Sequence, residues 1–278
     1  MLKFISFGSG SSGNSYLIEN DKDAIIVDAG IGIRKMKKDR FNNGIITQKI
    51  RAILLTHDHS DHCSAAHRLA KAFNIKVCAS IKVLENSKRF KIEQNMQMPV
   101  ENKRPFIINS FKITPFRIPH DSVDNFGYAI ESDGEMFTVM TDIGMPNDDV
   151  RFYIQHSNHL VIEADYDEYM LDTNPRYDQQ LKDRIKGGLG HLSNAQAAEL
   201  LAKHYHDKLK NVWLCHLSQE NNTPQLALNT ITNVLQQNGI NVGEHLNLHA
   251  LLRDTLCGPF YIKDASTEIH YQQLKLNI

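Results

Sequence analysis

The chain has 278 residues, of which 41% are hydrophobic and 23% are charged, so it can bury a substantial core. The formal net charge of -1 gives no global reason to expect a nucleic-acid partner. The 4 cysteines form no CxxC motif, which argues against a disulfide framework, and no apolar run approaches the ~20 residues of a membrane helix. We therefore expect a cytoplasmic protein that makes no membrane contact.

Strands dominate the first half of the chain. Short β-branched runs predict them over residues 4–7, 15–19, 24–28, 52–56, 77–80, 111–116, 128–131 and 137–141. A helical pattern covers residues 64–73, and the pair Asp133-Gly134 between two apolar runs is typical of a hairpin turn. Neighbouring strands are therefore joined by hairpins as well as by helical crossovers.

The second half repeats a rhythm of strand and helix. Strands are predicted over 160–162, 212–214 and 246–252, a capping box at Ser193 opens a helix to about Tyr205, and Thr223 begins another that Asn238 ends. Two mostly β halves with helices outside them predict an α/β fold, an αββα sandwich of two mixed β-sheets with helices on the outer faces. No linker or repeat divides the sequence, so we expect one domain over residues 1–278.

Residues 56–62, Thr-His-Asp-His-Ser-Asp-His, follow the apolar run 53–55 directly. Alternation along an extended segment places His57 and His59 on one side, and a turn into the helix at Ser64 brings Asp61 and His62 back toward them. So many partly desolvated ligand groups repel one another unless an ion lies among them. The segment favours a metal site for zinc, manganese or iron, and a solvated polar loop is the alternative.

Three more candidate ligands lie directly after apolar runs, and they are His120, Asp142 and His216. Each alone is unremarkable, since a single histidine is more often a surface or core residue. Ligands at strand ends converge at one rim of a sheet, so together with the heptapeptide the set is far more specific. The remaining histidines, His159 among them, are expected to be surface or core residues.

The order H-x-H-x-D-H, then His, Asp and His, resembles the metallo-β-lactamase superfamily, whose αββα fold carries a dinuclear site at one edge. The resemblance implies two divalent ions. One is held by His57, His59 and His120, the other by Asp61, His62 and His216, with Asp142 between them. Asp28 matches a buried aspartate of the superfamily, which supports the ligands without being one.

Segments 8–15, 190–194 and 215–222 also resemble the YycJ-like (WalJ/VicX) proteins, a group close to the tRNA 3′-processing endonucleases. This group implies a phosphodiesterase, with 5′ to 3′ exonuclease activity on double-stranded DNA. A metal-bridging hydroxide would attack the phosphodiester, and His191 would protonate the leaving group. Glu163 matches a glutamate that keeps this histidine protonated. Asp61 is counted with these catalytic residues as well as with the ligands.

Two segments are candidates for substrate binding. The Gly/Ser-rich run 8–15 offers Ser9, Ser12 and Asn14 to a phosphate, although a plain tight turn, ordered internally by Asn14, fits the pattern equally well. A basic stretch that includes Arg89 and Lys91 lies between the heptapeptide and His120, where it could form a wall of a nucleic-acid groove or simply a solvated face.

Two other functions remain open at this stage. The same ions could serve a carboxylic ester, thioester or lactam hydrolase, which needs no counterpart of the His191 and Glu163 pair. A metal-stabilised binding module without catalysis is the third reading. An alkoxide leaving group benefits from a general acid, so the pair favours phosphodiester chemistry.

Overall fold

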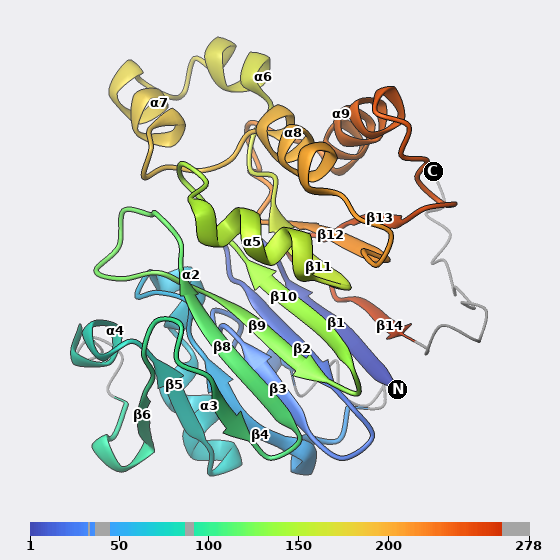
Figure 1. Cartoon of the computed structure of the whole chain (residues 1–278). Helices are drawn as coiled ribbons and strands as arrows, with labels where there is room; N and C mark the ends of the chain where they lie inside the picture. The colour runs from blue at the N-terminus through green and yellow to red at the C-terminus, as the bar shows by residue number, and fades with distance from the viewer. Residues whose placement is uncertain (33, 37–44, 87–91, 263–278) are drawn as a thin grey trace.

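The computed structural model describes residues 1–32, 34–36, 45–86 and 92–262. These residues form two sheets of seven strands that stack face to face, with helices outside them (Figure 1). In strand order, the first sheet contains β14 (Cys257–Ile262), β1 (Leu2–Gly8), β2 (Ser15–Glu19), β3 (Ala24–Val27), β4 (Ile50–Leu54), β5 (Lys76–Ala79) and β6 (Gln97–Pro99). The second contains β13 (Asn247–Ala250), β12 (Asn211–Cys215), β11 (His159–Glu163), β10 (Glu135–Met140), β9 (Phe126–Ser132), β8 (Phe111–Arg117) and β7 (Phe106–Ile108).

Side chains of the central strands alternate between two cores, as their fully buried patterns require. In β3, Ile25 and Val27 belong to the core between the sheets, whereas Ile26 belongs to the core beneath α2 (Ser60–Cys63), α3 (Ala66–Phe73) and α4 (Ile81–Asn86). In β11, Val161 faces the other sheet and Leu160 faces the helices. The αββα prediction is therefore confirmed.

The second sheet is covered on its outer face by α5 (Asp148–His156), α8 (Asn194–His204) and α9 (Pro224–Gln237) (Figure 1). Two further helices, α6 (Glu168–Thr173) and α7 (Gln179–Lys186), extend beyond the sheets, and η1 (Thr47–Lys49) and η3 (Gln94–Met96) are short 3₁₀ turns. No helix in the described ranges has the length and hydropathy needed to span a membrane.

Several local predictions are confirmed and two are corrected. Ser193 caps α8 in a full capping box, Thr223 caps α9, and Asp133 and Gly134 adopt positive φ in the turn between β9 and β10. The helix expected over 64–73 is observed as α3, from Ala66 to Phe73, and a separate helical turn, α2 from Ser60 to Cys63, precedes it. The strand expected over 246–252 is shorter and covers only β13.

Strand direction fixes where a site can form. Strands β3 to β6 run parallel to one another, as do β10 to β13, so the carboxyl ends within each set meet at one edge. The heptapeptide follows β4, Asp142 follows β10, Glu163 ends β11 and His216 follows β12. Both sheets therefore deliver polar side chains to the same rim of the sandwich.

Candidate metal centre

The heptapeptide leaves β4 and turns directly into α2. His59 is the N-cap of α2 in an extended conformation, and its side chain makes no capping hydrogen bond, so the imidazole is available for other contacts. Asp61 and His62 lie in the single turn of α2 and face back toward the strand end. The sharp entry into α2 is what folds seven consecutive residues around one point.

The backbone just before β2 and just after β3 holds this turn in place. Asn14 N donates to Asp61 O at 2.7 Å and Ala29 N donates to His62 O at 2.6 Å. Gly30 passes so close that an added Cβ would lie 1.6 Å from Asp61 O. Only glycine fits at that position, and any other residue would displace the ligand turn.

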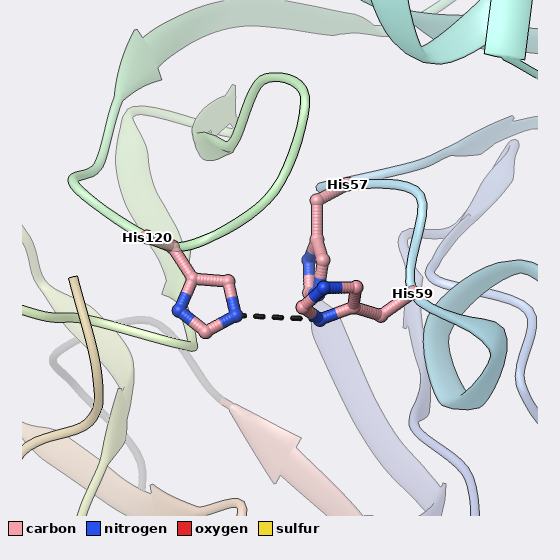
Figure 2. Close-up of side chains that lie close together, drawn as sticks. All are labelled: His57, His59 and His120. Atoms are coloured by element: carbon pink, nitrogen blue, oxygen red, sulfur yellow. Dashed lines mark hydrogen bonds between the residues drawn. The ribbon is translucent and has the colours of Figure 1, made fainter. Parts of the chain in front are cut away.

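His57, His59 and His120 form one group, and Figure 2 shows their rings turned toward one another. His120 Nε2 lies 3.4 Å from His59 Nδ1, and a ring nitrogen from each residue lies within 4.8 Å of the others. His120 follows β8 and comes from the second sheet, and its Nδ1 lies 3.1 Å from Gly190 O. The remaining Nε2 therefore points to the two histidines of the heptapeptide.

Asp61, His62 and His216 form a second group whose ligand atoms also lie within 4.8 Å of one another. Asp61 Oδ2 is 3.3 Å from His62 Nε2 and 3.5 Å from His216 Nε2. Asp142 lies between the two groups, because its Oδ2 is 3.2 Å from His62 Nε2 and its Oδ1 is 3.6 Å from His120 Nε2. The structure thus brings together all seven residues predicted as ligands.

Three residues at this rim adopt a left-handed backbone. Their φ values are 60° for Asp28, 54° for Asp142 and 57° for His216, a region that costs free energy for residues other than glycine. Each of the three lies one or two residues after a strand, where the αL turn redirects the chain and aims the side chain at the cluster. The rest of the fold must offset this local strain.

Ring-nitrogen pairing shows that the residues fit a metal ion. Nε2 of His57 is buried and has no hydrogen-bond partner among the described residues, whereas its Nδ1 contacts Thr56 Oγ1 at 3.0 Å. A buried nitrogen left without a partner is costly unless a cation uses its lone pair. His62 Nδ1 lies 2.7 Å from Asp28 Oδ2, and that contact leaves Nε2 facing the second group.

Charge in the cluster is divided in a way that suits cations. Burial lowers the pKa of His57 and of His120, so both imidazoles stay in the neutral form that binds metals. Burial alone would raise the pKa of Asp142, but the surrounding imidazoles, led by His216 and His62, hold it well below its usual range. The site therefore holds an ionised carboxylate beside two neutral imidazoles. Asp142 and the neighbouring carboxylates outweigh burial and raise the pKa of His62 and of His216 well above the usual range, so an ion bound there must displace their protons.

A histidine–glutamate pair borders the two groups. His191 Nδ1 lies 2.7 Å from Glu163 Oε1, while Glu163 Oε2 accepts from Ile143 N at 2.7 Å and from Leu192 N at 3.0 Å. Burial lowers the pKa of His191, but the Glu163 carboxylate outweighs it and raises the pKa to about 9. The pair is therefore fixed in place, with a protonated imidazole whose ring centroid is 5.1 Å from that of His120.

The Gly/Ser-rich loop lies against the metal cluster, but its predicted members play different parts. Ser9 is fully buried and its hydroxyl accepts from His216 N at 2.9 Å; Asn14 is also buried, and its Nδ2 is 2.9 Å from His62 Nε2. Ser9 thus supports the backbone of His216, whereas the Asn14 amide lies on the ligand side of the cluster, next to His62 Nε2 and Asp61 Oδ2. Ser12 is exposed and donates to Asp254, so substrate contact stays a prediction for Ser12. Arg89 and Lys91 lie outside the described residues.

Sequence reasoning overlooked two side chains that position ligands. Thr56 Oγ1 contacts both Asp28 and His57, and its backbone N donates to Asp28 Oδ1 at 2.8 Å. Asp165 Oδ1 lies 3.6 Å from His216 Nδ1. Thr56 opens the heptapeptide, so its place beside His57 was a usable signal, whereas nothing near Asp165 in the sequence points to His216.

Comparisons with known proteins agree with this geometry. The family model of the beta-lactamase superfamily domain matches residues 23–216. The exodeoxyribonuclease WalJ of Streptococcus pneumoniae is 32% identical over 91% of this chain and 95% of its own, and the exodeoxyribonuclease YycJ of Bacillus anthracis is 29% identical over 89% and 94%. The crystal structure of the metallo-beta-lactamase fold protein YhfI from Bacillus subtilis superposes with a TM-score of 0.68 at 14% identity, covering 92% of this chain and 99% of that one.

The structural likeness to YhfI concerns the fold alone, because sequence identity is low. The family match and the WalJ similarity each extend over most of the sequence and include the heptapeptide, His120 and Asp142. On these grounds the protein belongs to the beta-lactamase superfamily.

Proposed function

We propose that this protein is a metal-dependent exodeoxyribonuclease that degrades double-stranded DNA from the 5′ end, acting as one domain in the cytoplasm. The observation that carries the proposal is the buried Nε2 of His57, which has no hydrogen-bond partner among the described residues and lies in a histidine and aspartate cluster. The relatives WalJ and YycJ, both named exodeoxyribonucleases, support the choice of DNA as substrate.

Two divalent ions, zinc, manganese or iron, are the proposed cofactors. His57, His59 and His120 would hold one; Asp61, His62 and His216 would hold the other; Asp142 faces both groups. When bound, such ions lower the pKa of a water molecule and neutralise charge on the phosphate. Asp28 contacts Nδ1 of His62, and Thr56 contacts Nδ1 of His57. These contacts orient each ring so that its Nε2 faces the cluster, where an ion would bind.

His191 is the proposed general acid. Its Nδ1 is taken up by Glu163, so the proton on Nε2 is the one that can reach a substrate, and its side chain is 19% exposed at the rim. The departing alkoxide of a phosphodiester needs such a proton, because it is a poor leaving group. Glu163 contacts the ring through one hydrogen bond and keeps it protonated, and the backbone amides of Ile143 and Leu192 hold the Glu163 carboxylate in place.

Asp61 is the most accessible carboxylate of the cluster, with a side chain that is 20% exposed. The histidines beside it, led by His62, outweigh burial and lower the pKa of Asp61. An ionised carboxylate at this place can accept a hydrogen bond from a reacting water as well as bind an ion, and this is the catalytic part that we assign to it.

Digestion of 5′- and 3′-labelled duplex DNA tests the proposal, with the metal removed by chelation and then restored one species at a time. We expect release of nucleotides from the 5′ end and no turnover without metal. A thioester, a β-lactam and a bis-ester phosphate should be assayed in parallel. Turnover of the thioester or lactam with no attack on DNA would replace the nuclease by an ester or lactam hydrolase, and no turnover of any substrate would leave a binding module.

A further inference from the structure

An arginine lies across the Gly/Ser-rich loop beside the metal cluster. Arg253 follows β13, and a Cβ added to Gly10 would lie 2.7 Å from its Nη1 and 3.0 Å from its Cγ. Gly10 also has a φ of +153°. A side chain at position 10 would therefore push the guanidinium away, so the loop sequence and the arginine fit each other.

In the part of the chain that the structure describes, the guanidinium of Arg253 forms no ion pair with a carboxylate. Among the described residues, no carboxylate oxygen lies within 4.0 Å of Arg253. Its Nη1 and Nη2 donate to Ser11 Oγ at 3.1 and 2.9 Å, and its Nε is buried without a hydrogen-bond partner. The nearby Asp254 carboxylate accepts from Ser12 Oγ at 2.7 Å, and Lys35 Nζ donates to Asp254 O. Arginine in this state is well suited to bind a phosphate through its planar fork.

The loop ties Arg253 to the metal cluster at two points. Ser9 N donates to Arg253 O at 3.1 Å, while Ser9 Oγ accepts from His216 N. At the other end, Gly10 N donates to Asn14 Oδ1 at 2.8 Å, and Asn14 contacts His62. One loop thus separates the guanidinium from the ligands and fixes its position relative to them, which a second phosphate contact requires.

We propose that Arg253 and the exposed hydroxyl of Ser11 bind a phosphate group of the DNA strand other than the phosphate that is cleaved. This inference rests on the proposed nuclease function and adds a subsite to it. The contact places the strand in register with the metal cluster and contributes to binding in the ground state and the transition state alike. Its loss therefore raises KM and leaves kcat on DNA unchanged.

The test compares Arg253→Gln with the unaltered metal-loaded protein on duplex DNA and on bis(p-nitrophenyl) phosphate, a reporter with one phosphate. We expect the KM for DNA to rise on the order of tenfold, and the salt slope of DNA binding to fall by about one. The KM for the reporter should change by less than about twofold, because a molecule with one phosphate cannot contact the metal cluster and Arg253 at the same time.

Lys208→Gln is the matched control, because it removes one positive charge at the opposite end of β12 from His216. It should alter neither KM. Arg253→Lys should restore the salt slope without restoring the full affinity, since lysine keeps the charge and loses the fork. Equal KM changes for DNA and reporter, or an unchanged KM for DNA, would overturn the proposal.

Substrates with a 5′-phosphate and with a 5′-hydroxyl distinguish the source of the phosphate. An effect of Arg253→Gln restricted to 5′-phosphorylated DNA assigns the subsite to the terminal phosphate, and an effect on both assigns it to an internal one. If the unaltered protein does not cut DNA at all, the nuclease function fails; fluorescence anisotropy with a DNA oligonucleotide then still decides whether Arg253 binds phosphate.

Discussion

Strand β11 carries a histidine–glutamate pair at each end, and the two pairs serve different purposes. At its carboxyl end, Glu163 lies 2.7 Å from His191; at its amino end, His159 Nε2 lies 2.7 Å from Glu135 Oε2. Asn211 Nδ2 lies 3.0 Å from His159 Nδ1, so both ring nitrogens of His159 are engaged by the protein. In His191, Glu163 contacts Nδ1, and Nε2 remains available to a substrate at the rim.

The contrast teaches that burial and a carboxylate partner do not by themselves mark a functional histidine. His57 and His159 are both fully buried, and both follow or begin a buried strand. They differ in their ring nitrogens: both nitrogens of His159 are hydrogen-bonded, whereas Nε2 of His57 has no partner within the described ranges. The comparison leads to five predictions, taken from the largest effect to the smallest.

Replacing His57 should have the largest effect. His57→Leu removes a ligand atom without leaving a polar group unsatisfied, so we expect loss of bound metal and a fall in DNA cleavage on the order of 10³-fold or more. The metal-free variant should be as stable as the metal-free parent. Elemental analysis and denaturant unfolding check both points.

His159→Leu is the matched variant at the other end of the sheet. It removes one hydrogen-bond partner of Glu135 and one of Asn211, which keep Lys210 and Asn247, so the free energy of unfolding should fall by about 1–3 kcal/mol while metal content and activity persist. Loss of metal from His159→Leu, or retention of metal by His57→Leu, would break the comparison.

His191→Gln should lower kcat on DNA by about 10²–10⁴-fold, because a general acid contributes that much to the departure of an alkoxide. Metal content and the melting temperature should stay close to those of the parent. Single-turnover digestion of labelled duplex provides the rate, and a rate equal to that of the parent would refute the assignment.

Glu163→Gln and Glu135→Gln test the two carboxylates side by side. Glu163→Gln should reduce cleavage by about 10–100-fold, the usual cost of losing a residue that orients a functional side chain. Glu135→Gln should leave the rate unchanged. Equal rate losses from both variants would mean that the two ends of β11 do not differ in function.

Glu135 also predicts a small pH effect on stability. Hydrogen bonding to His159, and then to Lys210, outweighs burial and lowers its pKa to about 2. A lowered carboxyl pKa contributes stability above the pKa of the unfolded chain, and that contribution disappears as the pH falls toward 2. We expect about 1–2 kcal/mol at neutral pH after allowance for solvent screening. Urea unfolding of Glu135→Gln should show a shallower loss of stability than the parent between neutral and acidic pH.

The fold and the position of the cluster could be predicted because the ends of strands can be recognised in the sequence. His120, Asp142 and His216 each terminate an apolar run, and that signal led to the rim where the structure places them. The capping box at Ser193 and the Pro at the start of α9 depend only on neighbouring residues, so they were legible as well.

Elements without such local signals escaped prediction. Strand β14 contains Pro259 and β6 ends in Pro99, and both lie at sheet edges, where proline is tolerated but masks the strand pattern. Helix α7 has no buried residue, so its sequence shows no apolar periodicity. Its N-cap, Asp178, is the one local signal for this helix. The contact of Arg253 with Gly10 joins distant parts of the chain and follows from the tertiary fold alone.

The origin of the ligands has a consequence for the folding of the whole protein. The heptapeptide belongs to the first sheet, while His120, Asp142 and His216 belong to the second. An ion held at this rim therefore acts as a cross-link between the two layers, and its binding free energy adds to the cohesion of the sandwich. At a free concentration of 100 times its dissociation constant, one ion contributes about 2.7 kcal/mol. Thermal stability should accordingly rise with the concentration of free metal, so that protein without bound metal is less stable as well as inactive.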